Sequence, residues 1–143
     1  EEVCLMSFVE RIRVRYNECD MQNVVFNANY FMYADDAVAQ WMRHAVASLN
    51  GASNAALVSW SDLGFDFMLK TTTATWHKGA TYGDVIDAKC EAVRWGNTSF
   101  DVSVSMTVND EPIFDCIITY VSVTPGTHTP TPVPERIKAA FGR

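Results

Sequence analysis

The hydrophobic and polar positions change their period near Asn27, which separates a short leading strand from a long helix. Between Val9 and Tyr16 the residues alternate from Ile12 onward, a pattern typical of a strand with one buried face. From Asn27 the apolar residues recur at three- and four-residue spacing, which predicts a helix of about six turns with one apolar face. That face consists of Tyr30, Ala34, Ala37, Val38, Trp41, Met42, Ala45, Val46 and Leu49. We expect Asn27 to cap the start of this helix and Asn50-Gly51 to end it.

The rest of the chain is predicted to form strands joined by turns. The expected strands are Phe65–Trp76, Val85–Trp95, Ser99–Val108 and Ile113–Val123. Gly96-Asn97 and the segment 109–112 supply tight turns, and Pro134 precedes a short helix at Glu135–Phe141. One strand, one long helix and a run of antiparallel strands predict an α+β layer. We expect a single domain over residues 1–143 with the helix packed against one sheet.

Composition narrows the classes of function. A chain of 143 residues is long enough to bury a real core. The net charge of -6 argues against a general nucleic-acid binder, which needs clustered basic residues. Arg11, Arg13 and Arg15 share one strand face, which could touch a phosphorylated ligand, contact another subunit or simply be solvated. Without an apolar run long enough for a bilayer or a secretion signal, we expect a cytoplasmic protein with no membrane partner.

Neither the cysteines nor the histidines have the spacing of a metal or redox site. The four cysteines include no Cys-x-x-Cys pair, and the three histidines are far apart. They are Cys4, Cys19, Cys90, Cys116, His44, His77 and His128. We therefore expect reduced, buried thiols, no metal and no other cofactor.

Asp20 is the candidate catalytic residue. It lies in a short loop before the start of the long helix, where unpaired backbone N–H groups can bind a developing oxyanion. A carboxylate is ionised at neutral pH, so Asp20 could serve as a general base toward water or as a nucleophile. Backbone N–H groups around Phe26 and Asn27 would then bind the oxyanion. The alternative is that Asp20 only closes an Asx turn or caps the helix.

The segment from Tyr16 to Phe31 resembles the opening motif of hotdog-fold acyl-CoA thioesterases of the 4-hydroxybenzoyl-CoA thioesterase type. Tyr82-Gly83-Asp84, Arg94–Phe100 and Thr131–Glu135 are similar to further motifs of that family, in the same order, so the resemblance covers nearly the whole chain. It implies a curved antiparallel sheet wrapped around one long helix. It also implies hydrolysis of an acyl-CoA thioester to free acid and CoA, with Asp20 at the position of the catalytic aspartate. Coenzyme A would be part of the substrate.

The resemblance further implies an assembly in which sheets pair edge to edge. We expect a homodimer, or a dimer of dimers (a homotetramer), with each site built from two subunits. Asn23 stands where the family often has Gly, and Asn is the residue that best tolerates a positive φ after Gly. Asn27 or Asn29 stands where some relatives carry a His, so imidazole assistance from that position is lost.

Other acids and the thiol near Asp20 have simpler interpretations. Cys19 alternates away from Asp20 and has no nearby histidine in sequence, which favours an inert, buried thiol. Glu18 is expected to be solvated or bonded within the loop. Asp35 and Asp36 on the helix are reserve catalytic candidates, although the pattern favours a simple polar helix face.

The substrate-binding candidates follow from the same resemblance. Phe26 and Tyr30 are expected to line the acyl pocket, with Phe31, Trp60, Phe65, Phe67 and Met68 as further candidates, most of which would also suit the core. Arg94 and Lys78 are candidate contacts for the CoA phosphates. Asn97, Thr98 and Ser99 form a polar hairpin that could meet the nucleotide.

A second function remains open. The domain could bind acyl-CoA or acyl carrier protein thioesters without efficient hydrolysis, because a fold does not fix a function. Acyl carrier proteins are acidic, as this chain is, so such a partner would need a local basic patch such as Arg11, Arg13 and Arg15.

Overall fold

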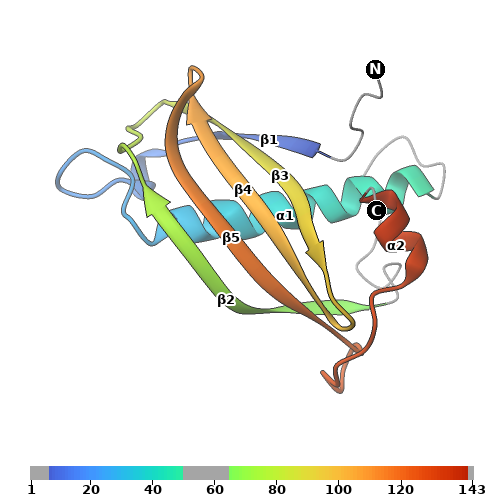
Figure 1. Cartoon of the computed structure of the whole chain (residues 1–143). Coiled ribbons are helices and arrows are strands. Elements are labelled where there is room, and N and C mark those ends of the chain that lie inside the picture. The colour runs from blue at the N-terminus through green and yellow to red at the C-terminus, as the bar shows by residue number, and fades with distance from the viewer. Residues whose placement is uncertain (1–6, 50–64, 142–143) are drawn as a thin grey trace.

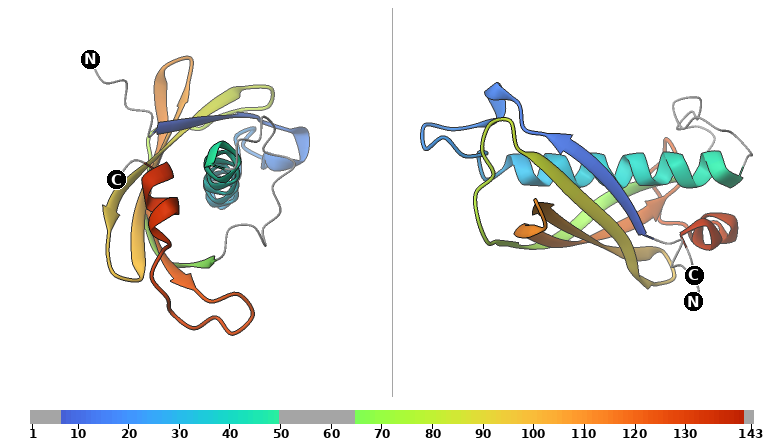
Figure 2. Two further views of the ribbon diagram at one scale, coloured as in Figure 1. Left: turned by 90° about the vertical axis from the view of Figure 1, so that its right-hand side faces the viewer. Right: turned by 90° about the horizontal axis from the view of Figure 1, so that it is seen from above.

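The computed structural model describes residues 7–49 and 65–141 of the chain (Figure 1). The elements, in chain order, are β1 (Ser7–Arg13), the 3₁₀ turn η1 (Tyr16–Glu18), α1 (Asn29–Leu49), β2 (Asp66–Trp76), β3 (Val85–Trp95), β4 (Ser99–Val108), β5 (Glu111–Val123) and α2 (Glu135–Ala140). The five strands form one antiparallel sheet in the order β1-β3-β4-β5-β2. Viewed along the axis of α1, the sheet curves around the helix (Figure 2).

The predicted elements are present, with shifts at their ends that have local causes. β3 and β4 have the predicted bounds, whereas β5 begins two residues early, at Glu111. The turn before β5 needs only Asn109 and Asp110, which both have positive φ, 50° and 65°. Two such residues suffice for a tight hairpin turn that matches the twist of its strands.

The first strand ends earlier, and the long helix begins later, than the sequence predicted. β1 ends at Arg13 because residues 16–18 turn back as η1. The helix begins at Asn29, so Asn27 lies in the preceding turn and is not its cap. The predicted helix stop at Asn50-Gly51 lies outside the described residues.

The core lies between α1 and the concave face of the sheet. Alternate residues of β3, β4 and β5 point at the helix and are buried, among them Ile86, Val104 and Phe114. Ala34 and Ala37 on the helix are also fully buried, and their small side chains let the helix lie close to the strands. The helix α2 closes the far end of this core, where the rings of Trp41 and Phe141 are 4.4 Å apart.

The two ends of the sheet carry different loops. The start of β3 is tied to the first loop, because Val14 N–H donates to Asp84 O over 2.9 Å. The hairpin 96–98 lies at the other end, roughly 33 Å away along β3 at about 3.3 Å per residue. Only the first of these ends carries Asp20.

Candidate active site

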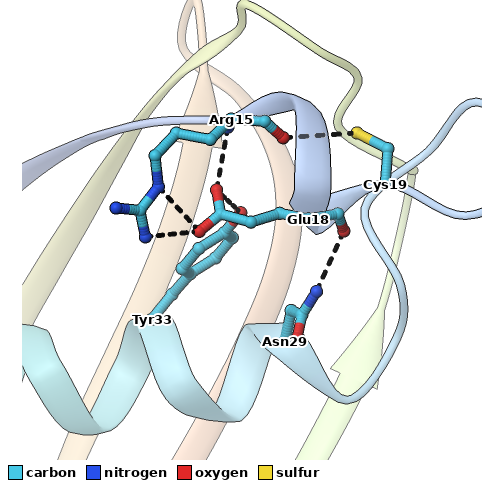
Figure 3. A network of polar contacts seen from close by, with 5 residues as sticks. All are labelled: Arg15, Glu18, Cys19, Asn29 and Tyr33. Atoms are coloured by element: carbon cyan, nitrogen blue, oxygen red, sulfur yellow. Dashed lines mark hydrogen bonds and ion pairs between the residues drawn. The ribbon is translucent and has the colours of Figure 1, made fainter.

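Glu18 anchors the loop that carries Asp20. Its carboxylate is 4% exposed and accepts hydrogen bonds from the Arg15 backbone N–H (2.8 Å), the Arg15 Nη2 (2.6 Å) and the Tyr33 hydroxyl (2.9 Å). Figure 3 shows these contacts joining Arg15, just before the turn η1, to Glu18 in that turn and to Tyr33 on the helix α1. Of the two interpretations of Glu18 from sequence, the loop-bonded one is correct, and the side chain is buried rather than solvated.

The contacts of Glu18 decide its ionisation. Burial raises the pKa of the Glu18 carboxyl, but the hydrogen bonds from Arg15 and Tyr33 outweigh that effect and leave the pKa below its ordinary value. Burial, together with the bond to Glu18, raises the pKa of the Tyr33 phenol. The pair Glu18 and Arg15 is therefore ionised around a neutral tyrosine at neutral pH.

The main-chain carbonyl of Glu18 ties the loop to the helix start. It accepts hydrogen bonds from Phe26 N–H (3.0 Å) and from Asn29 Nδ2 (2.9 Å). The Phe26 N–H is thus already bonded and cannot serve as the oxyanion donor that the sequence suggested. No acceptor lies within hydrogen-bond distance of the Asn27 N–H in residues 7–49 and 65–141. Asn27 is therefore the better candidate donor of the two.

Asp20 sits in a tight turn whose geometry leaves part of its carboxylate unbonded. Its Oδ1 accepts the Gln22 N–H over 2.8 Å, which closes an Asx turn, and its backbone N–H donates to Val24 O over 2.9 Å. Asn23 has φ of 64°, the positive value that was predicted for this position. Within the described chain no hydrogen bond reaches Asp20 Oδ2. Asp20 therefore closes an Asx turn through its Oδ1, as the alternative interpretation predicted. Its Oδ2 stays available to a substrate or a water.

A cavity of about 280 Å³ opens beside this carboxylate, and we call it the Trp76 cavity. Its walls are Asp20, Gln22, Val24, Val25, Asn27, Tyr30, Trp76, His77, Lys78 and Gly79. The Trp76 ring stands edge-on to Phe31 (centroids 5.7 Å apart) and to Phe114 (5.3 Å), so the aromatic wall is held by core packing. The structure thus brings together Asp20, Asn27 and Tyr30 of the predicted site, together with Lys78, a candidate phosphate contact.

Trp76 and His77 are among the wall residues that were not predicted as part of the site. Trp76 ends β2 and was assigned only to a strand, and His77 was discussed only as a non-ligand of metals. The His77 Nε2 is 2.6 Å from Asp115 Oδ2, so that carboxylate fixes the orientation of the ring. The sequence showed only that an aromatic residue and a histidine stand where a strand ends. That pattern does not indicate a site unless the fold shows which residues lie nearby.

Lys78 lines the Trp76 cavity, whereas the other predicted nucleotide contacts lie elsewhere. Arg94, Asn97, Thr98 and Ser99 are at the β3–β4 end of the sheet, away from Asp20 in the same chain. The Arg94 Nε donates to Asp101 Oδ2 over 2.7 Å, and its Nη2 donates to Ser99 Oγ over 3.0 Å. Within one chain the structure does not bring these residues to the candidate catalytic carboxylate.

Two of the basic side chains considered for phosphate contacts already have acidic neighbours. The Lys78 Nζ lies 3.0 Å from Glu111 Oε2, and the Arg11 Nε lies 3.3 Å from Asp87 Oδ1. Both of these ion pairs are solvent-exposed, so each contributes little and could be exchanged for a ligand.

The remaining acyl-pocket candidates divide between the surface and the core. Phe26 is half exposed beside the loop, whereas Tyr30 is buried and its hydroxyl accepts the Ala80 N–H over 3.0 Å. Phe65 and Phe67 pack near Tyr120, toward the other end of the sheet. Met68 is exposed. Trp60 lies outside the described residues.

Cys19 has no activating group. Its Sγ is 4.0 Å from Arg15 O, and no imidazole contacts it among the described residues. Cys90 and Cys116 are buried thiols, and burial raises the pKa of Cys90 to about 12 and that of Cys116 to about 11. Cys4 lies outside the described residues.

The reserve acids on the helix point away from the Trp76 cavity. Asp35 Oδ1 accepts a hydrogen bond from the hydroxyl of Tyr120 over 2.8 Å. Asp36 borders a different hollow, between the helix and β1, together with Glu10. Neither residue borders the cavity beside Asp20.

Among the described residues, no three His, Cys, Asp or Glu side chains are grouped to hold a metal ion. No helix in the described part of the chain has both the length and the apolar character needed to cross a bilayer.

The chain is similar to proteins of a known family. The family model described as the thioesterase-like superfamily matches residues 14–141. No curated protein sequence matches the chain.

Solved structures share the fold at low sequence identity. A 1,4-dihydroxy-2-naphthoyl-CoA thioesterase from Synechocystis is 14% identical, with a TM-score of 0.73 over 94% of this chain and 95% of that one. A gentisyl-coenzyme A thioesterase is 19% identical, with a TM-score of 0.75 over 94% of this chain and 100% of that one. A hypothetical protein from Aquifex aeolicus is 20% identical, with a TM-score of 0.78 over 94% of this chain and 98% of that one. These matches confirm the predicted hotdog fold.

Proposed function

Because the chain belongs to the thioesterase-like superfamily, we propose that it hydrolyses an acyl-CoA thioester to a free acid and CoA at Asp20. The observation that carries the proposal is that the Trp76 cavity is lined by both Asp20, whose Oδ2 accepts no hydrogen bond within the described chain, and Asn27, whose backbone N–H donates none there. A carboxylate and an oxyanion donor on one small cavity are the two groups that thioester hydrolysis needs.

Asp20 can act by either of two balanced routes. As a general base it takes a proton from water, the hydroxide adds to the thioester carbonyl, and the C–S bond then breaks to release CoA thiolate, which is protonated. As a nucleophile its Oδ2 displaces the thiolate to give a mixed anhydride, which water then hydrolyses to the acid and regenerated Asp20. In both routes the Asn27 N–H would stabilise the tetrahedral oxyanion. Neither route requires a cofactor.

We also propose an aromatic acyl group. Trp76 and Tyr30 are aromatic residues that line the cavity, and Phe31 packs edge-on against the Trp76 ring. Two structural neighbours are named as thioesterases of aromatic acyl-CoA substrates, which supports the same class of acyl group.

The proposal includes the assembly and the location of the protein. The free edge of β2, where Met68 and Leu69 are exposed, supports pairing of two sheets into a homodimer, with a dimer of dimers as the larger form. The free thiols of Cys19, Cys90 and Cys116 suit a reducing compartment such as the cytoplasm.

The direct test is Asp20→Asn. Thiol release from a panel of aromatic and fatty acyl-CoAs is followed with a thiol-reactive dye. We expect turnover to fall by about 10²–10⁴, because the variant keeps the shape of the side chain and loses its charge. Folding is checked by circular dichroism, and Asp66→Asn is the matched control because Asp66 Oδ1 also accepts a backbone N–H, from Phe67 at 2.8 Å.

Two outcomes would contradict the proposal. A folded Asp20→Asn protein with wild-type turnover would move the chemistry to Asp35 or Asp36. A wild-type protein that binds acyl-CoA without releasing thiol would instead favour the second function, a domain that binds thioesters.

A further inference from the structure

Three tyrosines are buried in the described part of the chain, and their hydroxyl groups are used differently. Tyr33 and Tyr120 donate their hydroxyl protons to carboxylate oxygens, over 2.9 Å and 2.8 Å. The Tyr30 hydroxyl instead accepts a hydrogen bond, from the Ala80 N–H over 3.0 Å, and it donates to no acceptor among the described residues. Tyr30 thus has a hydroxyl proton that this part of the chain leaves unbonded.

An unused donor at this depth needs an explanation. Tyr30 is 1% exposed, so bulk water does not solvate its hydroxyl. The hydroxyl of a buried tyrosine usually has a partner, and a buried donor without one costs free energy. Tyr30 also lines the Trp76 cavity, together with Asp20 and Asn27. A molecule bound in that cavity would supply the acceptor.

We propose that the Tyr30 hydroxyl is a catalytic hydrogen-bond donor, which together with the Asn27 N–H binds the oxygen of the thioester carbonyl. This inference rests on the proposed function. The hydroxyl donates a hydrogen bond and keeps its proton, so the bonds made and broken in either route at Asp20 stay the same. Its contribution grows as negative charge develops on the carbonyl oxygen.

The start of the helix places the two donors close together. Tyr30 is the second residue of α1, and helical side chains lean toward the N-terminal end, where Asn27 lies. The contacts of Ala80 fix the hydroxyl at the same place, because Ala80 O accepts the Val25 N–H over 2.9 Å while Ala80 N–H bonds the phenol oxygen. The hydroxyl is therefore tied to the loop that runs from Asp20 to Asn27.

Aromatic packing holds the ring that carries the hydroxyl. The Tyr30 ring stacks on Phe114, with centroids 5.0 Å apart and an interplanar angle of 21°, and it meets the Tyr33 ring edge to face at 6.1 Å. The Trp76 ring packs on the same Phe114 at 5.3 Å. A donor on a ring held in this way does not have to reorient as charge develops, which is the condition for efficient stabilisation of a transition state.

The surroundings of the phenol keep it protonated and make it a good donor. Burial raises the pKa of the Tyr30 phenol above its ordinary value, and this effect outweighs the hydrogen bond from Ala80 N–H, which lowers it. The hydroxyl therefore has a proton to donate at neutral pH. The bond from Ala80 N–H also polarises the phenol oxygen, which strengthens the hydrogen bond that the hydroxyl can donate.

The first test is Tyr30→Phe, which removes the hydroxyl and keeps the ring. We expect kcat for thioester hydrolysis to fall by about 10²–10³ with little change in KM, because one oxyanion donor is lost. Tyr120→Phe is the matched control, since it removes an equally buried hydroxyl from a residue that does not line the Trp76 cavity, and it should keep the wild-type kcat. A folded Tyr30→Phe protein with wild-type kcat would overturn the inference.

A second measurement separates donation to the substrate from a structural role, because Tyr30→Phe also leaves the Ala80 N–H without its acceptor. The probe is a ketone analogue of the acyl-CoA, in which a methylene group replaces the sulfur and an isotope label marks the carbonyl. A hydrogen bond lowers the infrared stretching frequency of a carbonyl. We expect the band of the bound analogue to move toward its free position in Tyr30→Phe and to stay in place in Tyr120→Phe. A fall in kcat without movement of the band would overturn the inference.

The ketone analogue also separates this inference from the proposed function. It cannot be hydrolysed, so its carbonyl band reports on Tyr30 even if the wild type releases no thiol, the result that would overturn hydrolysis. A wild type that does not bind the analogue would overturn both. If Tyr30→Phe does not fold, a fluorotyrosine in place of Tyr30 keeps the oxygen that accepts the Ala80 N–H and has a more acidic phenol. The band should then move further from its free position, and an unmoved band would overturn the inference.

Discussion

At the scale of single residues, Glu18 is the side chain on which the geometry of the site most depends. Its carboxylate bonds Arg15 and Tyr33, and its main-chain carbonyl bonds Phe26 and Asn29. One residue thus fixes both the start of the Asp20 loop and the turn before the helix. Replacing it would disturb the site without touching Asp20.

We predict that Glu18→Gln lowers the free energy of unfolding by about 2 kcal/mol at pH 7, because hydrogen bonds to a buried charged group are lost. The measurement is urea denaturation of the wild type and the variant. The exposed Glu91, paired with Lys89, provides the control Glu91→Gln, which should stay within about 0.5 kcal/mol of the wild type.

The same variant has a predictable pH dependence. The pKa of Glu18 is below its ordinary value in the folded protein. The ionised carboxylate therefore stabilises the fold fully at pH values above the pKa that Glu18 has in the unfolded chain. It is lost as the pH falls through the lower, folded pKa. The difference between wild type and Glu18→Gln should therefore shrink below about pH 4. A difference that stays constant down to pH 2 would show that the charge of Glu18 is not what stabilises the loop.

Cys19 should be dispensable although it precedes Asp20. Its thiol contacts only the Arg15 carbonyl, at 4.0 Å, among the described residues and has no base to ionise it. We expect Cys19→Ala to keep turnover within about tenfold of wild type, a barrier change of roughly 1.4 kcal/mol. Complete inactivation of a folded variant, or protection of the thiol from alkylation by substrate, would assign the nucleophile to Cys19.

At the scale of elements, the Asp20 loop depends on the segment that joins β2 to β3. Val25 N–H donates to Ala80 O over 2.9 Å, and Ala80 N–H donates to the Tyr30 hydroxyl over 3.0 Å. Gly79 lies against Val24, where a Cβ added to the glycine would be 2.8 Å from Val24 Cγ1. The glycine allows the two segments to approach.

We predict that Gly79→Ala lowers turnover about tenfold, a barrier change of roughly 1.4 kcal/mol, by pushing Val24 and the turn that holds Asp20 away from the Trp76 cavity. The double variant Gly79→Ala with Val24→Ala removes the contacting methyl group and should recover most of the activity. Steady-state kinetics on both variants checks the prediction. If the double variant is no more active than Gly79→Ala, the effect does not pass through Val24.

At the scale of the whole molecule, the sheet has two free edges, β1 and β2. We predict that β2 forms the dimer interface. Leu69 on β2 and Val9 on β1 are each 51% exposed, so a substitution of Val9 is a matched control for the same substitution of Leu69. Leu69→Lys should convert the dimer to monomer and abolish most of the activity, whereas Val9→Lys should change neither.

Light scattering and turnover across a concentration series check this prediction. The inactive variants Asp20→Asn and Asn27→Trp should not restore activity when mixed, because both residues line the Trp76 cavity of one chain and no hybrid dimer then has a site with both intact. A monomer with full activity would contradict the prediction that the dimer is the active unit.

The sequence by itself determined the elements and indicated the residue that we propose as the centre of the site. Period-two and period-3.6 patterns report which side of a segment is buried, so the strands Val85–Trp95 and Ser99–Val108 and the long helix could be placed from local information. Asp20 and the positive φ of Asn23 follow from a continuous motif, whose residues are neighbours in the chain as well as in space.

Only the tertiary structure decided what surrounds Asp20. Glu18 is buried because Tyr33 and Arg15 bond to it, and Phe26 loses its free N–H because the chain turns back onto Glu18. Trp76 and Tyr82 reach the Asp20 loop from positions more than fifty residues away in the chain, whereas Arg94 and the hairpin after it are carried to the opposite end of the sheet. Contacts between distant segments depend on strand order and direction, which local periodicity does not encode.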